Sequence, residues 1–221
     1  MAPIADVVAN LEVVRGRIRA AGGDPARVTV VAVTKKLPIA SVQAAVDAGV
    51  VDVGENYAQE LVVKAAEAPP AVRWHFLGPV QRNKVAALAP HVHLWQAVDR
   101  DDAAAAIAAR APGAAVLIQV NVTGEPGKHG CAVADAPAVV DHARALGLDV
   151  RGLMTVGPLG DPDGARPGFR ALADLARTLE LSELSMGMSA DLEVAVQEGA
   201  TIVRIGTALL GPRPVNGEVR R

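Results

Sequence analysis

Residues 28–36 read VTVVAVTKK, and this stretch decides the fold. Its first six residues are apolar or β-branched on both faces, a pattern typical of a strand buried in a parallel sheet. Two lysines end the strand, and a helical pattern at residues 39–48 follows Pro38. An apolar strand that ends in polar residues and leads into a helix is the repeating unit of α/β proteins.

The same unit recurs along most of the chain. The strand-like segments are residues 28–33, 51–53, 73–77, 94–98, 116–120, 150–153, 183–185 and 202–205. The helix-like segments are residues 4–20, 39–48, 57–67, 82–88, 101–110, 134–146, 167–179 and 192–198. Eight strands that alternate with helices in 221 residues predict one domain, residues 1–221, folded as a TIM-type (β/α)8 barrel. A doubly wound open sheet is the alternative.

Composition excludes several classes of protein. The net charge of −2 predicts neither a nucleic-acid nor a membrane partner, and an aromatic content of 2% leaves few rings for stacking on bases. No apolar run reaches the roughly 18 residues of a membrane span, and the N-terminus lacks the apolar core of a signal peptide. We therefore expect a cytoplasmic protein. A single cysteine, Cys131, excludes an intramolecular disulfide and a cysteine-based metal cluster, and we predict no metal site.

Polar and glycine residues follow the predicted strands at their carboxyl ends, where barrels carry their chemistry. Lys35 ends an apolar strand, and partial desolvation there would lower its pKa and favour the amine that attacks an aldehyde. An ordinary solvated loop lysine is the alternative. The glycine-rich turns at residues 187–189 and 206–207 suit a phosphate, since barrels often bind phosphate after their last two strands. Two plain turns are the alternative there.

Six motifs in order carry a resemblance to a known family. They are AVTK (32–35), GENYAQE (54–60), WHFLGPVQRNK (74–84), RGLMT (151–155), LSMGMSAD (184–191) and VRIGTA (203–208). With them, the chain resembles the YggS/PROSC-type pyridoxal 5′-phosphate (PLP) homeostasis proteins over almost its full length. The resemblance implies a barrel like the N-terminal domain of alanine racemase, with PLP in its mouth.

The resemblance also implies roles for individual residues. Lys35 would hold PLP as a Schiff base, and Lys36 would point elsewhere because neighbouring strand side chains alternate. Ser189 and the backbone of Gly206 and Thr207 would bind the phosphate. Arg204 would face the pyridine nitrogen and leave it unprotonated, which makes PLP a weaker electron sink.

Four further residues would line the pocket around the ring, and each has a structural alternative. Asn56 would otherwise cap a helix, His75 would be a hydrogen-bonded core histidine, Asn121 would anchor a turn, and Met154 would be core packing. Cys131 is expected to be inert, because nothing near it in sequence favours a thiolate.

Two functions follow from the resemblance. The first is a carrier without catalytic activity, a monomer or weak homodimer that binds PLP reversibly and passes it to apo-enzymes. The alternative is a one-domain amino-acid racemase or lyase with Lys35 as its base. Racemisation needs proton exchange on both faces of the α-carbon, and the chain offers only His75 as a second base. Its one tyrosine, Tyr57, lies in the second motif and not in an added domain.

Overall fold

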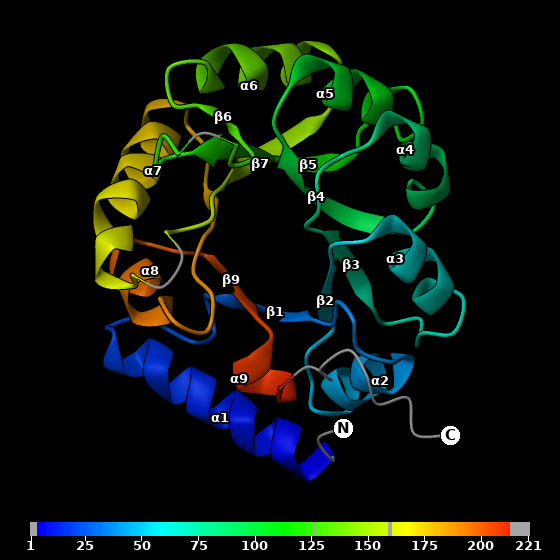
Figure 1. Ribbon diagram of the computed structural model, residues 1–221, viewed down its shortest axis with the longest axis vertical. Coiled ribbons are helices and arrows are strands. Elements are labelled where there is room, and N and C mark those ends of the chain that lie inside the picture. Colours follow the sequence, from blue (N-terminus) through cyan, green and yellow to red (C-terminus); the bar gives the residue numbers. More distant parts are fainter. Residues whose placement is uncertain (1–3, 126, 159–160, 213–221) are drawn as a thin grey trace.

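A ring of parallel strands lies inside a ring of helices (Figure 1) in the computed structural model, which describes residues 4–125, 127–158 and 161–212. The neighbouring strands run in the order β4-β3-β2-β1-β9-β8-β7-β5, and a β4–β5 pairing closes the ring. The strands are β1 (Thr29–Val33), β2 (Asp52–Glu55), β3 (Arg73–Phe76), β4 (Val92–Val98), β5 (Ala115–Asn121), β7 (Asp149–Met154), β8 (Glu183–Ser185) and β9 (Ile202–Ile205). The predicted eight-stranded barrel is confirmed, and the open sheet is not.

Each predicted helix is present with bounds close to those expected. The helices are α1 (Ile4–Ala20), α2 (Ile39–Asp47), α3 (Ala58–Ala65), α4 (Arg82–Leu88), α5 (Asp101–Ala108), α6 (Ala136–Ala145), α7 (Arg166–Thr178) and α8 (Leu192–Gln197). Three short elements lie outside the prediction: strand β6 (Cys131–Ala132), the 3-10 turn η1 (Asp163–Ala165) and helix α9 (Thr207–Leu210). A two-residue strand and single turns of helix are too short to show a period in the sequence.

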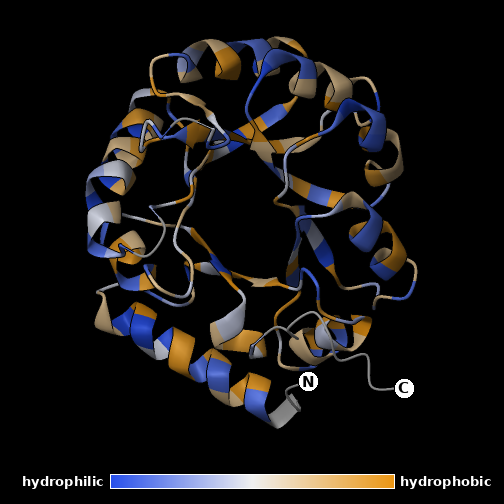
Figure 2. Cartoon of the chain, in the orientation of Figure 1, coloured by the Kyte–Doolittle hydropathy of each residue, from blue (hydrophilic) through white to orange (hydrophobic). Residues whose placement is uncertain are grey.

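The main core lies between the strands and the helices. Helix α1 buries Val7, Leu11, Val14 and Ile18, which recur at helical spacing, while Val8 on the other face is 45% exposed. The other helices also alternate between apolar and polar residues (Figure 2), and their buried apolar side chains belong to the same core. Because aromatic residues are scarce, small aliphatic side chains fill most of this layer. None of the described helices is long and apolar enough to cross a membrane.

A smaller apolar cluster fills the inside of the barrel. It consists of Val31, Leu94, Ala97, Ala115, Leu117, Met154 and Ile202. Along β1, Val31 belongs to this inner cluster and Ala32 to the outer core, as strand alternation requires. The same alternation turns Val33 and Lys35, two and four residues after Val31, toward the barrel axis. Both residues line the cavity at the mouth of the barrel.

Candidate functional site

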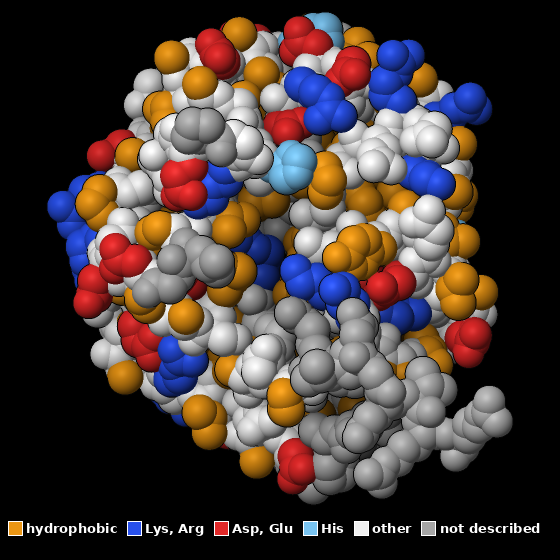
Figure 3. Space-filling model, viewed as in Figure 1, with side chains coloured by type: hydrophobic (Ala, Val, Ile, Leu, Met, Phe, Trp, Pro, Cys, Tyr) orange, Lys and Arg blue, Asp and Glu red, His pale blue; other side chains and the backbone are white. Residues whose placement is uncertain are grey.

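A cavity of ≈ 450 Å³ opens at the carboxyl ends of the strands. Figure 3 shows this face of the molecule, hollowed near its centre and edged by Lys and Arg side chains. The cavity is lined by Val33, Lys35, Asn56, Leu77, Met154, Val156, Met188, Ser189, Ala190, Arg204, Gly206 and Thr207. The structure therefore brings together all the predicted site residues except His75 and Asn121.

The backbone around Lys35 is fixed from both sides. The buried Thr34 donates from Oγ1 to Glu55 Oε1 at 2.7 Å, and its main-chain oxygen accepts from Lys64 Nζ at 2.8 Å. On the other side, Lys36 adopts a left-handed φ of 60° and donates its N–H to Glu60 Oε2 at 2.8 Å. Lys36 is exposed while Lys35 is half-buried against the cavity.

A buried ion pair supports this strand end. Lys64 Nζ lies 2.5 Å from Glu55 Oε1 and 3.3 Å from Glu60 Oε2. Burial raises the pKa of Glu55, and the hydrogen bonds from Lys64 and Thr34 oppose that rise without cancelling it. Among the described residues, no group donates a hydrogen bond to Glu55 Oε2, so the carboxylate is held through Oε1 alone.

Arg204, from β9, places a cation at the cavity. Its side chain is buried and donates to Ser185 Oγ and to the main-chain oxygen of Thr155, each at 2.7 Å. Burial lowers the pKa of Arg204 to about 10, and the charge of Asp191 opposes the shift. The guanidinium therefore stays charged at neutral pH, with its plane fixed by two acceptors.

Two glycine-containing turns meet beside this cation. Ser189 Oγ accepts a hydrogen bond from Ala208 N at 3.4 Å, which brings the turn after β8 against the start of α9. Gly187 has a φ of 91°, and its main-chain oxygen accepts from Arg204 N at 2.9 Å. A hydroxyl beside successive backbone N–H groups is an arrangement that binds phosphate.

The sequence of this chain is similar to that of known proteins over most of its length. The family model described as "Alanine racemase, N-terminal domain" matches residues 4–214. A protein of Pseudomonas aeruginosa named pyridoxal phosphate homeostasis protein is 43% identical, over 96% of this chain and 97% of its own. This chain belongs to the pyridoxal phosphate homeostasis family. A Deinococcus radiodurans protein of the same name is 45% identical over 86% of this chain and 91% of its own.

Solved structures agree with membership of the homeostasis family. PipY of Synechococcus elongatus, with PLP bound, matches with a TM-score of 0.77 and 33% identity over 90% of this chain and 100% of that one. Alanine racemase of Clostridium difficile matches with a TM-score of 0.73 over 96% of this chain and 62% of its own. At 13% identity, that second likeness concerns the fold alone.

His75 lies at the other end of the barrel. It lines a separate cavity of ≈ 300 Å³ together with Asp52, Arg73 and His93, near the amino ends of the strands. Its ring donates or accepts at both nitrogens, with Asp52 Oδ1 at 2.9 Å and Gln96 Nε2 at 2.7 Å. His75 was expected to line the pocket around the PLP ring, and the structure does not place it there. Its side chain points into the barrel, but nearer the amino ends of the strands than the mouth cavity.

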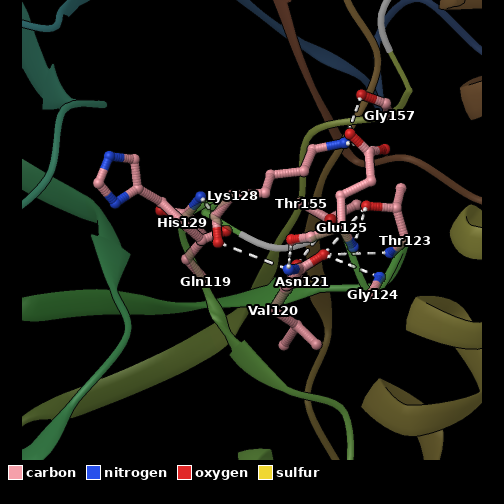
Figure 4. A network of polar contacts seen from close by, with 10 residues as sticks. All are labelled: Gln119, Val120, Asn121, Thr123, Gly124, Glu125, Lys128, His129, Thr155 and Gly157. Carbon is pink, nitrogen blue, oxygen red and sulfur yellow. Dashed lines mark hydrogen bonds and ion pairs between the residues drawn. The ribbon is translucent and has the colours of Figure 1, made fainter.

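Asn121 organises a loop instead of lining the mouth cavity (Figure 4). Its Oδ1 accepts from Thr123 N, Thr123 Oγ1 and Gly124 N at 3.0–3.2 Å. Its Nδ2 donates to the main-chain oxygens of Glu125 at 3.1 Å and Lys128 at 3.4 Å. These contacts match the turn-anchoring alternative, since an asparagine side chain readily bonds the backbone that follows it.

A second, larger hollow of ≈ 870 Å³ lies on the outside of the barrel, over α4 and α5. Its lining includes Arg82 of α4, Asp102 of α5, and Arg100 and Arg110, which flank α5. The mouth cavity is the better candidate site in this family because groups from the ends of several strands converge there.

Reasoning from sequence missed the residues that fix Lys35 from behind. Glu55 and Glu60 lie in one of the family motifs, but nothing in the motif assigns them a role. Lys64 follows Glu60 by four residues on α3, so it lies on the same helix face. That spacing, next to a strand ending in a glutamate, was the available signal.

Proposed function

We propose that this chain binds PLP in the mouth cavity, with Lys35 Nζ joined to the PLP aldehyde as a Schiff base. The amine adds to the aldehyde carbon, and one water leaves as the C=N bond forms. One observation carries the proposal: an amine, a buried guanidinium and a phosphate-compatible turn line the same cavity. The structure of the related protein PipY with PLP bound supports the same cofactor.

The phosphate is proposed to lie against Ser189, Gly206 and Thr207. The serine hydroxyl and the backbone N–H groups at the start of α9 converge there. The turn is held in place from outside by Arg17 of α1, whose NH2 donates to the main-chain oxygen of Ser189 at 2.9 Å. Arg17 is in turn paired with Glu193 at 2.6 Å.

The ring is proposed to lie between the phosphate turn and Lys35. Arg204 would donate a hydrogen bond to the pyridine nitrogen, and Met154 and Asn56 would contact the ring from other strands. When bound, PLP supplies an electrophilic carbon and an electron sink, and a guanidinium at its nitrogen makes that sink weak. The charged state of Arg204 at neutral pH supports this arrangement.

We propose that the protein carries PLP and does not turn over amino acids. The described side chains that line the cavity include Lys35 as their one amine and no histidine, carboxylate, tyrosine or cysteine. Racemisation needs a second group that exchanges a proton on the opposite face of the substrate. Incubation with a panel of amino acids in deuterium oxide tests this: we expect no α-proton exchange at enzymatic rates, and rapid exchange would overturn it.

The proposal extends to the role in the cell. Residues 1–221 would form one PLP-binding barrel domain, a monomer or weak homodimer in the cytoplasm, that releases PLP to apo-enzymes. Mixing the loaded protein with an excess of a purified apo-enzyme, across a dialysis membrane and in direct contact, tests the transfer. We expect the apo-enzyme to be reactivated faster in direct contact than across the membrane. Equal rates would show that the protein only releases PLP into solution and does not hand it over directly.

The site is tested by comparing Lys35→Ala with Lys36→Ala, its neighbour on the exposed side of the turn. We expect the parent and Lys36→Ala to show the visible band of lysine-bound PLP and Lys35→Ala to lack it. Borohydride reduction followed by peptide mass spectrometry should place the modification on Lys35. A modification at Lys36, or one scattered over surface lysines, would refute the assignment.

A further inference from the structure

A row of buried hydrogen bonds runs through the barrel interior from one end to the other. Arg204 NH1 donates to Ser185 Oγ at 2.7 Å, and Ser185 Oγ donates to Gln96 Oε1 at 2.6 Å. Gln96 Nε2 lies 2.7 Å from His75 Nδ1, and His75 Nε2 lies 2.9 Å from Asp52 Oδ1. The row thus joins the mouth cavity to the cavity at the amino ends of the strands.

With the ring proton of His75 on Nε2, every bond in this row points the same way. A guanidinium can only donate, so Ser185 accepts from Arg204 and its own proton goes to the oxygen of Gln96. The amide NH2 of Gln96 then donates to His75 Nδ1, which leaves the ring proton on Nε2, facing the carboxylate of Asp52. Asp52 only accepts, and it also accepts from Arg73 NH2 at 2.5 Å. A donor at one end, an acceptor at the other and a single ring proton on Nε2 of His75 together give the row one direction.

The two middle members, Ser185 and Gln96, are too buried for water to replace a lost partner. Ser185 and Gln96 have no exposed surface, His75 is 2% exposed and Arg204 is 5% exposed. A buried polar group without a partner costs far more than a hydrogen bond contributes. Bonds aligned in series also polarise one another, which strengthens the acceptor that Ser185 presents to Arg204.

We propose that Ser185, Gln96 and His75 are positioning residues that hold Arg204 aimed at the bound cofactor. They do so by keeping Ser185 Oγ an acceptor on the side of Arg204. This inference rests on the proposed function, because it takes Arg204 to meet the pyridine nitrogen of PLP. His75 thus serves the site from the far end of the barrel, without touching the cofactor.

Charged and titratable groups surround His75 at the amino ends of the strands. They come from four strands besides its own neighbour Arg73: Asp52 on β2, His93 on β4 with its ring centroid 6.0 Å away, Arg151 on β7 and Glu183 on β8. A proton on Nδ1 would face the NH2 group of Gln96, so the amide would have to turn over and the row would lose its direction.

The tautomer of His75 is measured directly in the protein without cofactor. Nitrogen-15 NMR of histidine-labelled protein, assigned with a His75→Gln variant, should show the proton on Nε2 and none on Nδ1. In Gln96→Glu, a carboxylate of the same shape faces both neighbours, and His75 should carry both protons. A proton on Nδ1 in the parent would overturn the proposed direction, whether or not PLP binds.

PLP binding then tests the effect on Arg204, with Gln119→Leu as the matched control. Gln119 is also a buried glutamine of a barrel strand, but its amide donates to the main-chain oxygen of His129 at 3.2 Å. We expect Gln96→Leu and Ser185→Ala to weaken PLP binding about tenfold and to shift the visible band of bound PLP. Gln119→Leu should leave the band unchanged, and Gln96→Glu, which still accepts from Ser185, should keep most of the parent affinity.

The outcomes separate this inference from the proposed function. A parent protein that binds no PLP refutes the function, while the NMR measurement still reports on the row. Parent-like affinity and an unshifted band in Gln96→Leu refute the positioning role, while Lys35 labelling still stands. If Gln96→Leu does not fold, Ser185→Ala and Gln96→Glu carry the comparison.

Discussion

Lys64 Nζ, on helix α3, donates a 2.8 Å hydrogen bond to the main-chain oxygen of Thr34, the residue directly before Lys35. The same ammonium is paired with the fully buried Glu55 on the neighbouring strand. One buried cation therefore ties a helix and two strands together behind the proposed PLP-binding lysine. This contact holds the backbone before Lys35, as the bond from Lys36 N to Glu60 holds the backbone after it.

Removing that cation should destabilise the protein strongly. In Lys64→Met, Glu55 keeps its burial but loses its charged partner, and breaking a buried pair from one side costs about 3–5 kcal/mol. Urea unfolding measures the loss. The double variant Lys64→Met with Glu55→Gln removes both charges and should recover part of it. A single variant as stable as the parent would show that the pair contributes nothing.

Asn121 should matter for stability and little for PLP. Asn121→Ala removes the side chain that bonds residues 123–125 and Lys128, at a cost of about 1–3 kcal/mol in unfolding free energy. Because Asn121 lines a different hollow and none of its side-chain hydrogen bonds to the described residues reaches the proposed PLP site, PLP affinity should change by less than about twofold. Titration with PLP checks this, and a tenfold loss of affinity with intact stability would restore Asn121 to the binding site.

Cys131 should react slowly with thiol reagents in the folded protein. Burial raises the pKa of its thiol to about 11, with the charge of Asp99 adding to the effect. At pH 8 the thiolate fraction should then be about two orders of magnitude below that of an unfolded cysteine. Iodoacetamide labelling with and without urea compares the two states. Equal rates would contradict the burial of the thiol.

Asp52 should contribute stability that disappears in acid. Burial acts to raise the pKa of Asp52, but hydrogen bonds from His75 and Arg73 outweigh it and leave the pKa below the ordinary value of 3.8. Such a group stabilises the fold fully above that ordinary value, and the contribution is lost as the pH falls through the lower folded value. Asp52→Asn should therefore be less stable than the parent at neutral pH, and the difference should shrink below about pH 4.

Unfolding curves at several pH values test this sign. Asp174→Asn is the control, since Asp174 pairs with Arg177 at an exposed position on α7. That variant should differ little from the parent at any pH. A stability difference for Asp52→Asn that grows in acid would show that the sign is wrong.

Gly187→Ala should weaken PLP binding through the phosphate turn. A methyl group there would lie 2.5 Å from Ala195 Cβ, at a φ of 91° that L-residues seldom adopt. Gly49→Ala is matched to it, with a φ of 87° and no atom within 4 Å of the added methyl. Both should lose about 1 kcal/mol of stability from the backbone strain, and Gly187→Ala more. Only Gly187→Ala should lower PLP affinity, and an equal loss in both would point to a general effect.

The sequence predicted the barrel because its buried strands leave continuous apolar runs such as residues 28–33. The choice of Lys35 over Lys36 came from the resemblance to the family, and side-chain alternation along the strand then implied that Lys36 points elsewhere. The sequence could not place His75, because the height of an inward residue depends on how far neighbouring strands are shifted against one another. Gly54 and Leu94, the neighbours of His75 across β2 and β4, set that height. No local pattern contains that register.

The role of Asn121 was equally hidden from the sequence. Asparagine after a strand is common both in turns and in binding sites, and only the contacts of Asn121 with residues 123–125 and Lys128 distinguish them. Lys64 stayed unnoticed because a lysine on a helix is most often exposed. In each case the missing information is a contact between segments far apart along the chain.

The pairing of β1 with β9 and the hold of Arg17 on Ser189 join the first and last parts of the chain. During synthesis, Lys35 leaves the ribosome long before the strand that carries Arg204. The nascent chain must therefore keep its early strands without their final neighbour until β9 has been synthesised. Ring closure and assembly of the pocket then become one late event, so a chain stalled before β9 would have neither a closed barrel nor a place for its ligand.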